Sequence, residues 1–186
     1  MQNFEFTHKK ISGLMEITPF FVGDERGYFQ KSFEKAIFEE NGILFDVYEE
    51  FISFSRYGVI RGLHFQAQEP QSKLVCAPQG EVFDVAVDLR EDSPTFGQWE
   101  AVILSAENRK IFLVPAGFAH GFAVLSESAV VSYKCAGRYL KDYDTGIVWN
   151  DPDINVQWPD DVCRDVILSE RDSKLQSLKE FREMLI

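Results

Sequence analysis

Short runs of interleaved apolar and polar residues dominate the chain, and turn residues separate them at intervals of roughly ten residues. This pattern predicts many short strands and is typical of a β-sandwich or barrel. The expected strands are Gly13–Pro19, Glu50–Phe54, Leu74–Ala77, Val82–Leu89, Gln98–Leu104, Lys110–Val114, Gly121–Val124 and Ala129–Ala136.

Helical patterns are few. Phe33–Asn41 is predicted to be a helix that a glycine ends. Ser169 through Leu185 is predicted to be a second helix, with Ser169 as its N-cap and Asp172 in its first turn. Because no repeat or low-complexity tract divides the sequence, we expect one all-β domain over residues 1–186, with a few short peripheral helices.

One expected strand carries two carboxylates on a single face. Strand alternation places Asp84, Ala86 and Asp88 on one side and Val85 and Val87 on the other. The carboxylate face is therefore either solvated or lines a polar cavity.

Composition and charge narrow the class of partner. The 186 residues carry a net charge of −11, which argues against nucleic acid or an anionic membrane as partner. The 17 phenylalanines are enough to line a barrel interior as well as fill a core. Three cysteines without a CxxC pair fit reduced thiols, and the polar N-terminus resembles no signal peptide, so we expect a cytoplasmic protein.

Two histidines lie in aromatic β segments. His64 belongs to the run Arg61–Gln66, and His120 belongs to Pro115–Phe122. A lone histidine is usually structural. A second histidine, a strand tyrosine and an aspartate near the C-terminus together favour a functional site. The combination indicates proton transfer on an anionic small molecule.

His64 has the properties of a general base, because imidazole titrates near neutrality. A neutral imidazole needs its second nitrogen fixed by a partner, usually a carboxylate. The candidates are Asp172, Asp84 and Asp88. The competing interpretation of Asp172 is a first-turn carboxylate that interacts with the helix dipole.

Two more side chains suit the same chemistry. Tyr133 lies mid-strand, where a tyrosine usually packs and finds one hydrogen-bond partner, but in a cavity its phenol could act as a general acid. Lys73 would usually be a solvated charge, yet it precedes an apolar pair, and a lysine at a strand mouth can stabilise an oxyanion. With Arg61, it could form a local cationic patch for an anionic ligand.

A metal site is the competing interpretation of the two histidines. The segment Pro115-x-Gly117-x-x-His120 resembles the second cupin motif, but Val124 stands where that motif ends in Asn. The first motif's His-x-His is also missing, because the chain has His64-Phe65-Gln66 there. We therefore expect no structural or catalytic metal.

Taken together, several stretches resemble the RmlC family, the cofactor-free 3,5-epimerases of nucleotide-linked 4-keto-6-deoxy sugars. The resemblance covers nearly the whole chain and implies a cupin-type double-stranded β-helix (jelly roll) that forms a homodimer. The matching stretches are Asp24–Phe29, Arg61–Gln66, Lys73–Val75, Gly80–Arg90, Val114–Phe122, Tyr133–Cys135 and Leu168–Asp172.

The resemblance also implies roles for individual residues. His64 would be the base, oriented by Asp172, and Tyr133 the acid on the opposite face of the sugar. Lys73 would stabilise the enolate oxygen. Arg26 and Arg61 would contact the diphosphate, His120 would lie nearby, and Asp84 would support the site. The other substrate-binding residues implied are Phe21, Phe29, Lys31, Glu49, Phe51 and Asp144.

Departures from the family pattern bear on the nucleotide. The thymidine-linked rhamnose enzymes carry Glu at the position of Lys31, Gln-x-Asn at Glu49-Glu50-Phe51, and Arg at Cys76. These changes favour GDP-4-keto-6-deoxy-heptose, for capsular polysaccharide, as the leading substrate. The alternative is a dTDP-4-dehydrorhamnose 3,5-epimerase, and an alternative of another class is a non-catalytic cupin sugar-binding module. Whether C3, C5 or both are inverted stays open.

Overall fold

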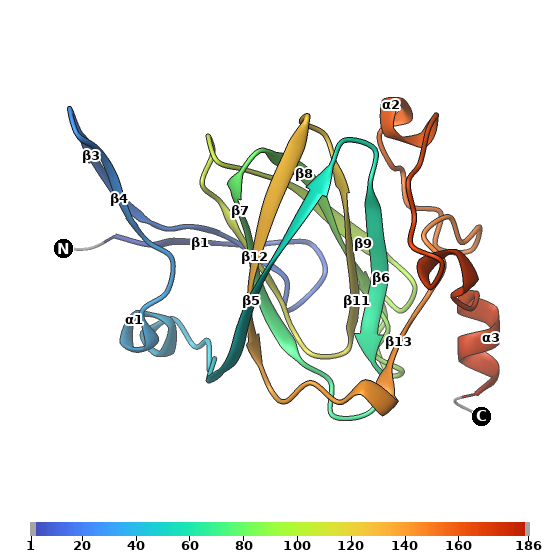
Figure 1. Ribbon diagram of the computed structural model, residues 1–186. Helices are drawn as coiled ribbons and strands as arrows, with labels where there is room; N and C mark the ends of the chain where they lie inside the picture. Colours follow the sequence, from blue (N-terminus) through green and yellow to red (C-terminus); the bar gives the residue numbers. More distant parts are fainter. Residues whose placement is uncertain (1–2, 185–186) are drawn as a thin grey trace.

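Two antiparallel sheets face each other in the computed structural model, which describes residues 3–184 (Figure 1). The first sheet has the order β1-β2-β10-β7-β12-β5, and the second has the order β13-β6-β11-β8-β9. A separate hairpin, β3-β4, projects from this body. The arrangement is the expected all-β jelly roll of the cupin type.

The strand bounds follow the order of the sheets. The six-stranded sheet comprises β1 (Glu5–His8), β2 (Met15–Thr18), β10 (Ile111–Val114), β7 (Ser72–Gln79), β12 (Ser128–Ala136) and β5 (Val47–Arg56). The five-stranded sheet comprises β13 (Asp144–Gly146), β6 (Ile60–Gln66), β11 (Phe118–Val124), β8 (Glu81–Asp88) and β9 (Trp99–Ser105). The hairpin comprises β3 (Phe20–Asp24) and β4 (Gly27–Lys31).

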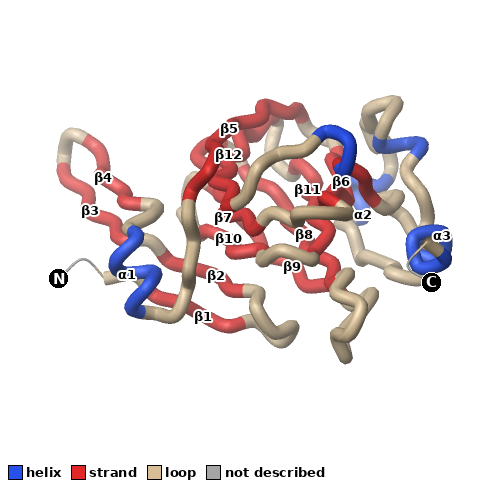
Figure 2. The backbone as a smooth tube through the Cα atoms, turned by 90° about the horizontal axis from the view of Figure 1, so that it is seen from below, coloured by secondary structure: helices blue, strands red, loops and turns tan. Residues whose placement is uncertain are grey.

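The helices are short and peripheral. They are α1 (Lys35–Glu40), α2 (Asp160–Cys163) and α3 (Leu178–Glu183), with 3-10 turns at Lys141–Tyr143 and Asp172–Lys174. Figure 2 shows α1 and the hairpin at one end of the molecule, with α2 and α3 at the other. No helix within residues 3–184 is long and apolar enough to cross a membrane.

Strand alternation on β8 divides the core into two layers. Ala86 packs between the sheets with residues such as Phe112 and Phe122. Val85 and Val87 pack on the outer side of the five-stranded sheet, beneath the C-terminal segment. Burying both faces in this way removes apolar surface from water on each side of the sheet.

The two carboxylates of β8 are fully buried. Asp84 and Asp88 each have an exposed fraction of 0%. Asp84 pairs with His120, whereas Asp88 pairs with Arg90 and accepts hydrogen bonds from neighbouring hydroxyls. Of the two alternatives for this face, the solvated one is therefore wrong.

All eight expected strands are present, and Phe33–Asn41 contains α1. The continuous helix predicted from Ser169 is wrong. Ser169 Oγ does accept a hydrogen bond from the Asp172 amide, but the turn ends at Lys174 and the chain becomes extended. A new N-cap at Ser177, with a reciprocal capping box, then starts α3, and the predicted end at Leu185 lies outside the described residues.

This break positions Asp172. On one side of it, the Ile167 amide donates to the Gly58 carbonyl and the Ile60 amide donates to the Ile167 carbonyl. On the other side, the Val148 amide donates to the Gln176 carbonyl. Backbone hydrogen bonds on both flanks thus hold the turn that carries Asp172 against the β6 side of the barrel (Figure 1).

Candidate active site

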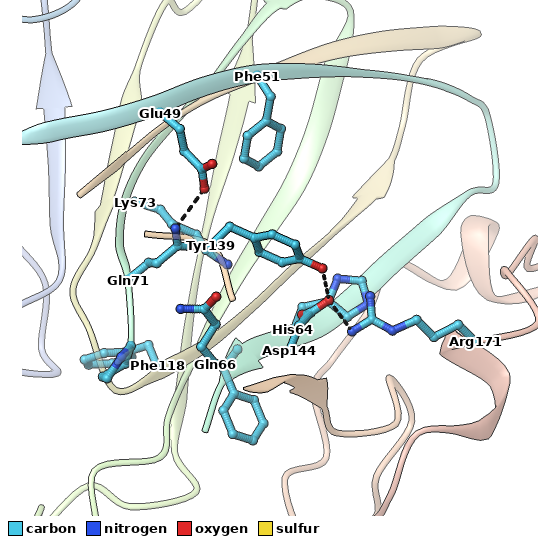
Figure 3. Close-up of a pocket in the computed structure, with 12 residues that line it drawn as sticks. Glu49, Phe51, His64, Gln66, Gln71, Lys73, Phe118, Tyr139, Asp144 and Arg171 are labelled. Carbon is cyan, nitrogen blue, oxygen red and sulfur yellow. Dashed lines mark hydrogen bonds and ion pairs between the residues drawn. The ribbon is translucent and has the colours of Figure 1, made fainter. Parts of the chain in front are cut away.

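A cavity of about 350 Å³ opens at one end of the barrel (Figure 3). Both sheets and the C-terminal segment contribute to its wall. The lining residues are Glu49, Phe51, His64, Phe65, Gln66, Pro70, Gln71, Lys73, Phe118, Tyr139, Asp144 and Arg171.

His64 reaches the cavity from β6 and is oriented by a buried carboxylate. Its Nε2 lies 2.8 Å from Asp172 Oδ1, and the Gly62 amide donates to Asp172 Oδ2 over 3.4 Å. Burial acts to raise the pKa of Asp172, but the hydrogen bonds from His64 and Gly62 hold it below its ordinary value. With Nε2 engaged, Nδ1 is the ring nitrogen left to accept a proton.

The second histidine forms a deeper pair. His120 lies directly opposite His64 across the β6–β11 ladder, and its Nε2 lies 2.8 Å from Asp84 Oδ1. Burial raises the pKa of Asp84, against the opposing effects of His120 and Lys73. Asp84 Oδ2 is buried and has no hydrogen-bond partner among the described residues.

Each of the three candidate carboxylates therefore has its own partner: Asp172 holds His64, Asp84 holds His120, and Asp88 holds Arg90. Across residues 3–184, no group of three or more His, Cys, Asp or Glu side chains is arranged to hold a metal ion.

Tyr133 lies on the facing sheet, in β12. It is only 7% exposed, and burial raises the pKa of its phenol far above the ordinary value, so the group stays protonated at neutral pH. Its ring stacks on Phe51 at a centroid distance of 4.7 Å, and the His120 ring meets it edge-on at 5.9 Å. Tyr133, His120 and Asp84 are buried and are not among the residues that line the cavity.

Lys73 enters the cavity from β7, two positions before the residue opposite Tyr133. Burial lowers the pKa of Lys73 below its ordinary value. No described carboxylate lies within ion-pair distance of its ammonium group, although Asp84 and Asp144 act on it electrostatically. Its amino group is thus free to contact a ligand oxygen inside the cavity.

At the cavity mouth, three side chains form a connected group (Figure 3). Asp144 Oδ2 accepts a hydrogen bond from Tyr139 Oη at 2.9 Å and forms an ion pair with Arg171 Nη2 at 2.9 Å. Asp144 was predicted to bind substrate, whereas Tyr139 and Arg171 were not predicted. Arg171 stands beside Asp172 in a stretch that was already singled out, whereas nothing in the sequence connects Tyr139 with Asp144.

Arg61 lies outside the cavity wall. Its Nε donates to Ser55 Oγ over 2.9 Å, and its Nη2 donates to the Phe54 carbonyl over 3.2 Å. Arg61 thus bonds to β5, the edge strand of the six-stranded sheet, and does not enter the cavity.

The remaining predicted binding residues lie on the projecting hairpin, away from the cavity (Figures 1 and 2). Phe21 and Phe29 are 38% and 56% exposed, and Arg26 is paired with Asp24 beside it in the hairpin turn. Lys31, at the base of the hairpin, forms an ion pair with Glu34. These residues do not meet the cavity of their own chain.

Comparison with known proteins identifies the family. The model of the family described as dTDP-4-dehydrorhamnose 3,5-epimerase matches residues 8–180. The enzyme of that name from Methanothermobacter thermautotrophicus is 48% identical over 180 residues, covering 97% of both chains. The one from Pseudomonas aeruginosa is 46% identical, covering 89% of this chain and 91% of its own. The chain belongs to the dTDP-4-dehydrorhamnose 3,5-epimerase family.

The solved structures agree with this assignment. The family member RmlC from Legionella pneumophila, solved in complex with dTDP-4-keto-L-rhamnose, superposes with a TM-score of 0.94 at 43% identity. The match covers 99% of this chain and 97% of that one. The predicted RmlC-like family and the epimerase class of enzyme are thereby confirmed.

The leading expectation for the substrate finds no support in these comparisons. GDP-heptose and a capsule pathway are not indicated, and the alternative, a dTDP-linked rhamnose precursor, fits better. The differences from the family pattern that favoured GDP lie at only a few positions, and not all of these positions line the cavity. Glu49 and Phe51 do line the cavity, but Lys31 does not, and Cys76 lies in a groove on the outer face of the six-stranded sheet.

Proposed function

We propose that the protein is a cofactor-independent dTDP-4-dehydrorhamnose 3,5-epimerase that inverts both C3 and C5 of its sugar. The observation that carries this proposal is the placement of a histidine–aspartate pair and a protonated tyrosine on facing sheets. His64 with Asp172 belongs to the five-stranded sheet side, and Tyr133 belongs to the six-stranded sheet.

The 4-keto group makes the hydrogens at C3 and C5 acidic. In the proposed reaction, His64 Nδ1 takes a proton from one of these carbons, and the electrons of the C–H bond move into the carbonyl to form an enolate. The Lys73 ammonium stabilises the enolate oxygen. Tyr133 then donates its proton to the opposite face of the carbon, which inverts it, and solvent restores the protonation of both side chains.

The walls of the cavity suit a nucleotide sugar. Lys73 offers a cation in the interior, and Tyr139 and Arg171 offer an aromatic face and a second cation at the mouth. The relatives solved with dTDP ligands support dTDP as the nucleotide.

We further propose a homodimer in which the hairpin of one subunit reaches the cavity of its partner. Arg26, Phe21 and Phe29 do not reach the cavity of their own chain, and Tyr28 and Phe29 of the hairpin are more than half exposed. An isolated two-stranded hairpin is marginally stable in water, so packing against a second copy would stabilise it. This arrangement accounts for both the exposed aromatics and the binding roles expected of these residues.

His64→Asn should abolish proton exchange at both carbons while leaving the fold intact. General acid–base catalysis contributes about 10²–10⁴-fold, so the loss should be at least ~10²-fold. The measurement is solvent-deuterium incorporation into dTDP-4-keto-6-deoxyglucose, followed by NMR. The exposed His8 provides a matched control, since His8→Asn changes the same residue type outside the cavity. Near-wild-type exchange by a folded His64→Asn variant would rule out His64 as the base.

Tyr133→Phe should impair inversion more than exchange, because it removes the proton donor on one face but leaves the base in place. Deuterium should still enter the sugar, but with return to the original face. Product configuration and deuterium content would be read in the same NMR experiment. Tyr57→Phe is the control, because its hydroxyl lies outside the cavity and donates to exposed Asp161. Undiminished inversion by Tyr133→Phe would assign the donor role to another group.

The hairpin proposal predicts complementation between two inactive variants. Arg26→Ala and His64→Asn, mixed as subunits, should regain up to about a quarter of wild-type activity, because half of the dimers are mixed and each has one intact cavity. Light scattering should give twice the mass of the 21.4 kDa chain. If the hairpin served its own cavity, every mixed dimer would stay inactive.

A further inference from the structure

Phe51 and Tyr133 are cross-strand partners on the inner face of the six-stranded sheet. Their ring centroids are 4.7 Å apart, and the angle between the ring planes is 19°. Tyr133 is 7% exposed, while Phe51 is 46% exposed and lines the cavity. Figure 3 shows Phe51 projecting from β5 toward the cavity interior. Phe51 therefore packs beside the ring of the proposed acid and itself borders the cavity.

We propose that Phe51 is a positioning residue that fixes the ring plane of Tyr133, and thereby determines how often an abstracted proton is replaced on the opposite face. The inference rests on the proposed function, because it assigns a role relative to that reaction. Phe51 itself transfers no proton.

Three neighbours lie around the Tyr133 ring, and Ser53 lies near its phenol. Phe51 covers one face, His120 meets the ring edge-on at 5.9 Å, and Val75 is the cross-strand partner on the other neighbouring strand, β7. His120 is itself fixed by Asp84. Of the three, only Phe51 borders open space, because Val75 and His120 are buried and do not line the cavity.

Removal of the Phe51 ring would therefore open a route for Tyr133 to swing into the cavity. Aromatic side chains occupy discrete rotamers, so loss of the stack makes a second orientation accessible. Proton transfer requires close alignment, and a displacement of about 1 Å can cost 10²-fold in rate. Because His64 lies on the facing sheet, the loss should affect reprotonation more than abstraction.

Phe51→Ala removes the stack, and Phe51→Tyr keeps an aromatic ring in the same place. The first readout is the ratio of inversion to deuterium exchange on dTDP-4-keto-6-deoxyglucose at saturating substrate. We expect this ratio to fall at least about tenfold in Phe51→Ala and to be restored in Phe51→Tyr. A variant that merely bound substrate less well would need more substrate to reach saturation and would leave the ratio unchanged.

The second readout needs no substrate. In protein labelled with 3-fluorotyrosine, the Tyr133 signal is identified by its absence in Tyr133→Phe. We expect Phe51→Ala to shift and broaden this ¹⁹F signal, because the ring current of Phe51 and the confinement it imposes are both lost. Wild-type enzyme inert toward the sugar would refute the proposed function, and the ¹⁹F spectrum would still decide whether Phe51 holds Tyr133.

Two results would overturn the inference. One is an unchanged ratio together with an unchanged Tyr133 signal in Phe51→Ala. The other is an unchanged ratio with weakened binding of dTDP in a titration, which would make Phe51 a contact for the nucleotide instead of a support for Tyr133.

Discussion

The hydrogen bond between His64 and Asp172 joins two parts of the chain that are 108 residues apart. It forms because the C-terminal segment is bound by its backbone on both sides of Asp172, next to strand β6. A carboxylate buried without such a partner would be costly, so the pair also stabilises the position of the segment. The proposed chemistry depends on this contact, since the neutral imidazole is useful only when its second nitrogen is fixed.

The register of the strands positions the other side chains of the site. His64 and His120 are opposite each other on one sheet, and Phe51 and Tyr133 are opposite each other on the other. Because side chains alternate along a strand, a shift of one residue in either ladder would turn these groups out of the barrel. The cavity is thus a consequence of pairing between strands distant in sequence.

Much of the fold was predictable from local pattern. The alternation in β8 correctly separated Asp84, Ala86 and Asp88 from Val85 and Val87, and turn residues bounded the main strands. The C-terminal helix was mispredicted because Ser169 and Ser177 each start a turn, and apolar periodicity cannot show that the chain is extended between them. Tyr139 was missed because the segment between it and Asp144 is an irregular turn, whose side-chain directions follow no periodic pattern. Residues of the hairpin were predicted to bind substrate, but a single sequence does not say in which subunit.

The proposed reaction requires base and acid to act from facing sheets on carbons made acidic by the neighbouring ketone. It is tested most directly by the reaction of the wild-type protein with dTDP-4-keto-6-deoxyglucose in deuterium oxide, with the product analysed by NMR. We expect a product inverted at C3 and C5 that carries one solvent deuterium at each of the two carbons. An inverted product without solvent deuterium, or no turnover of this sugar by folded protein, would contradict it.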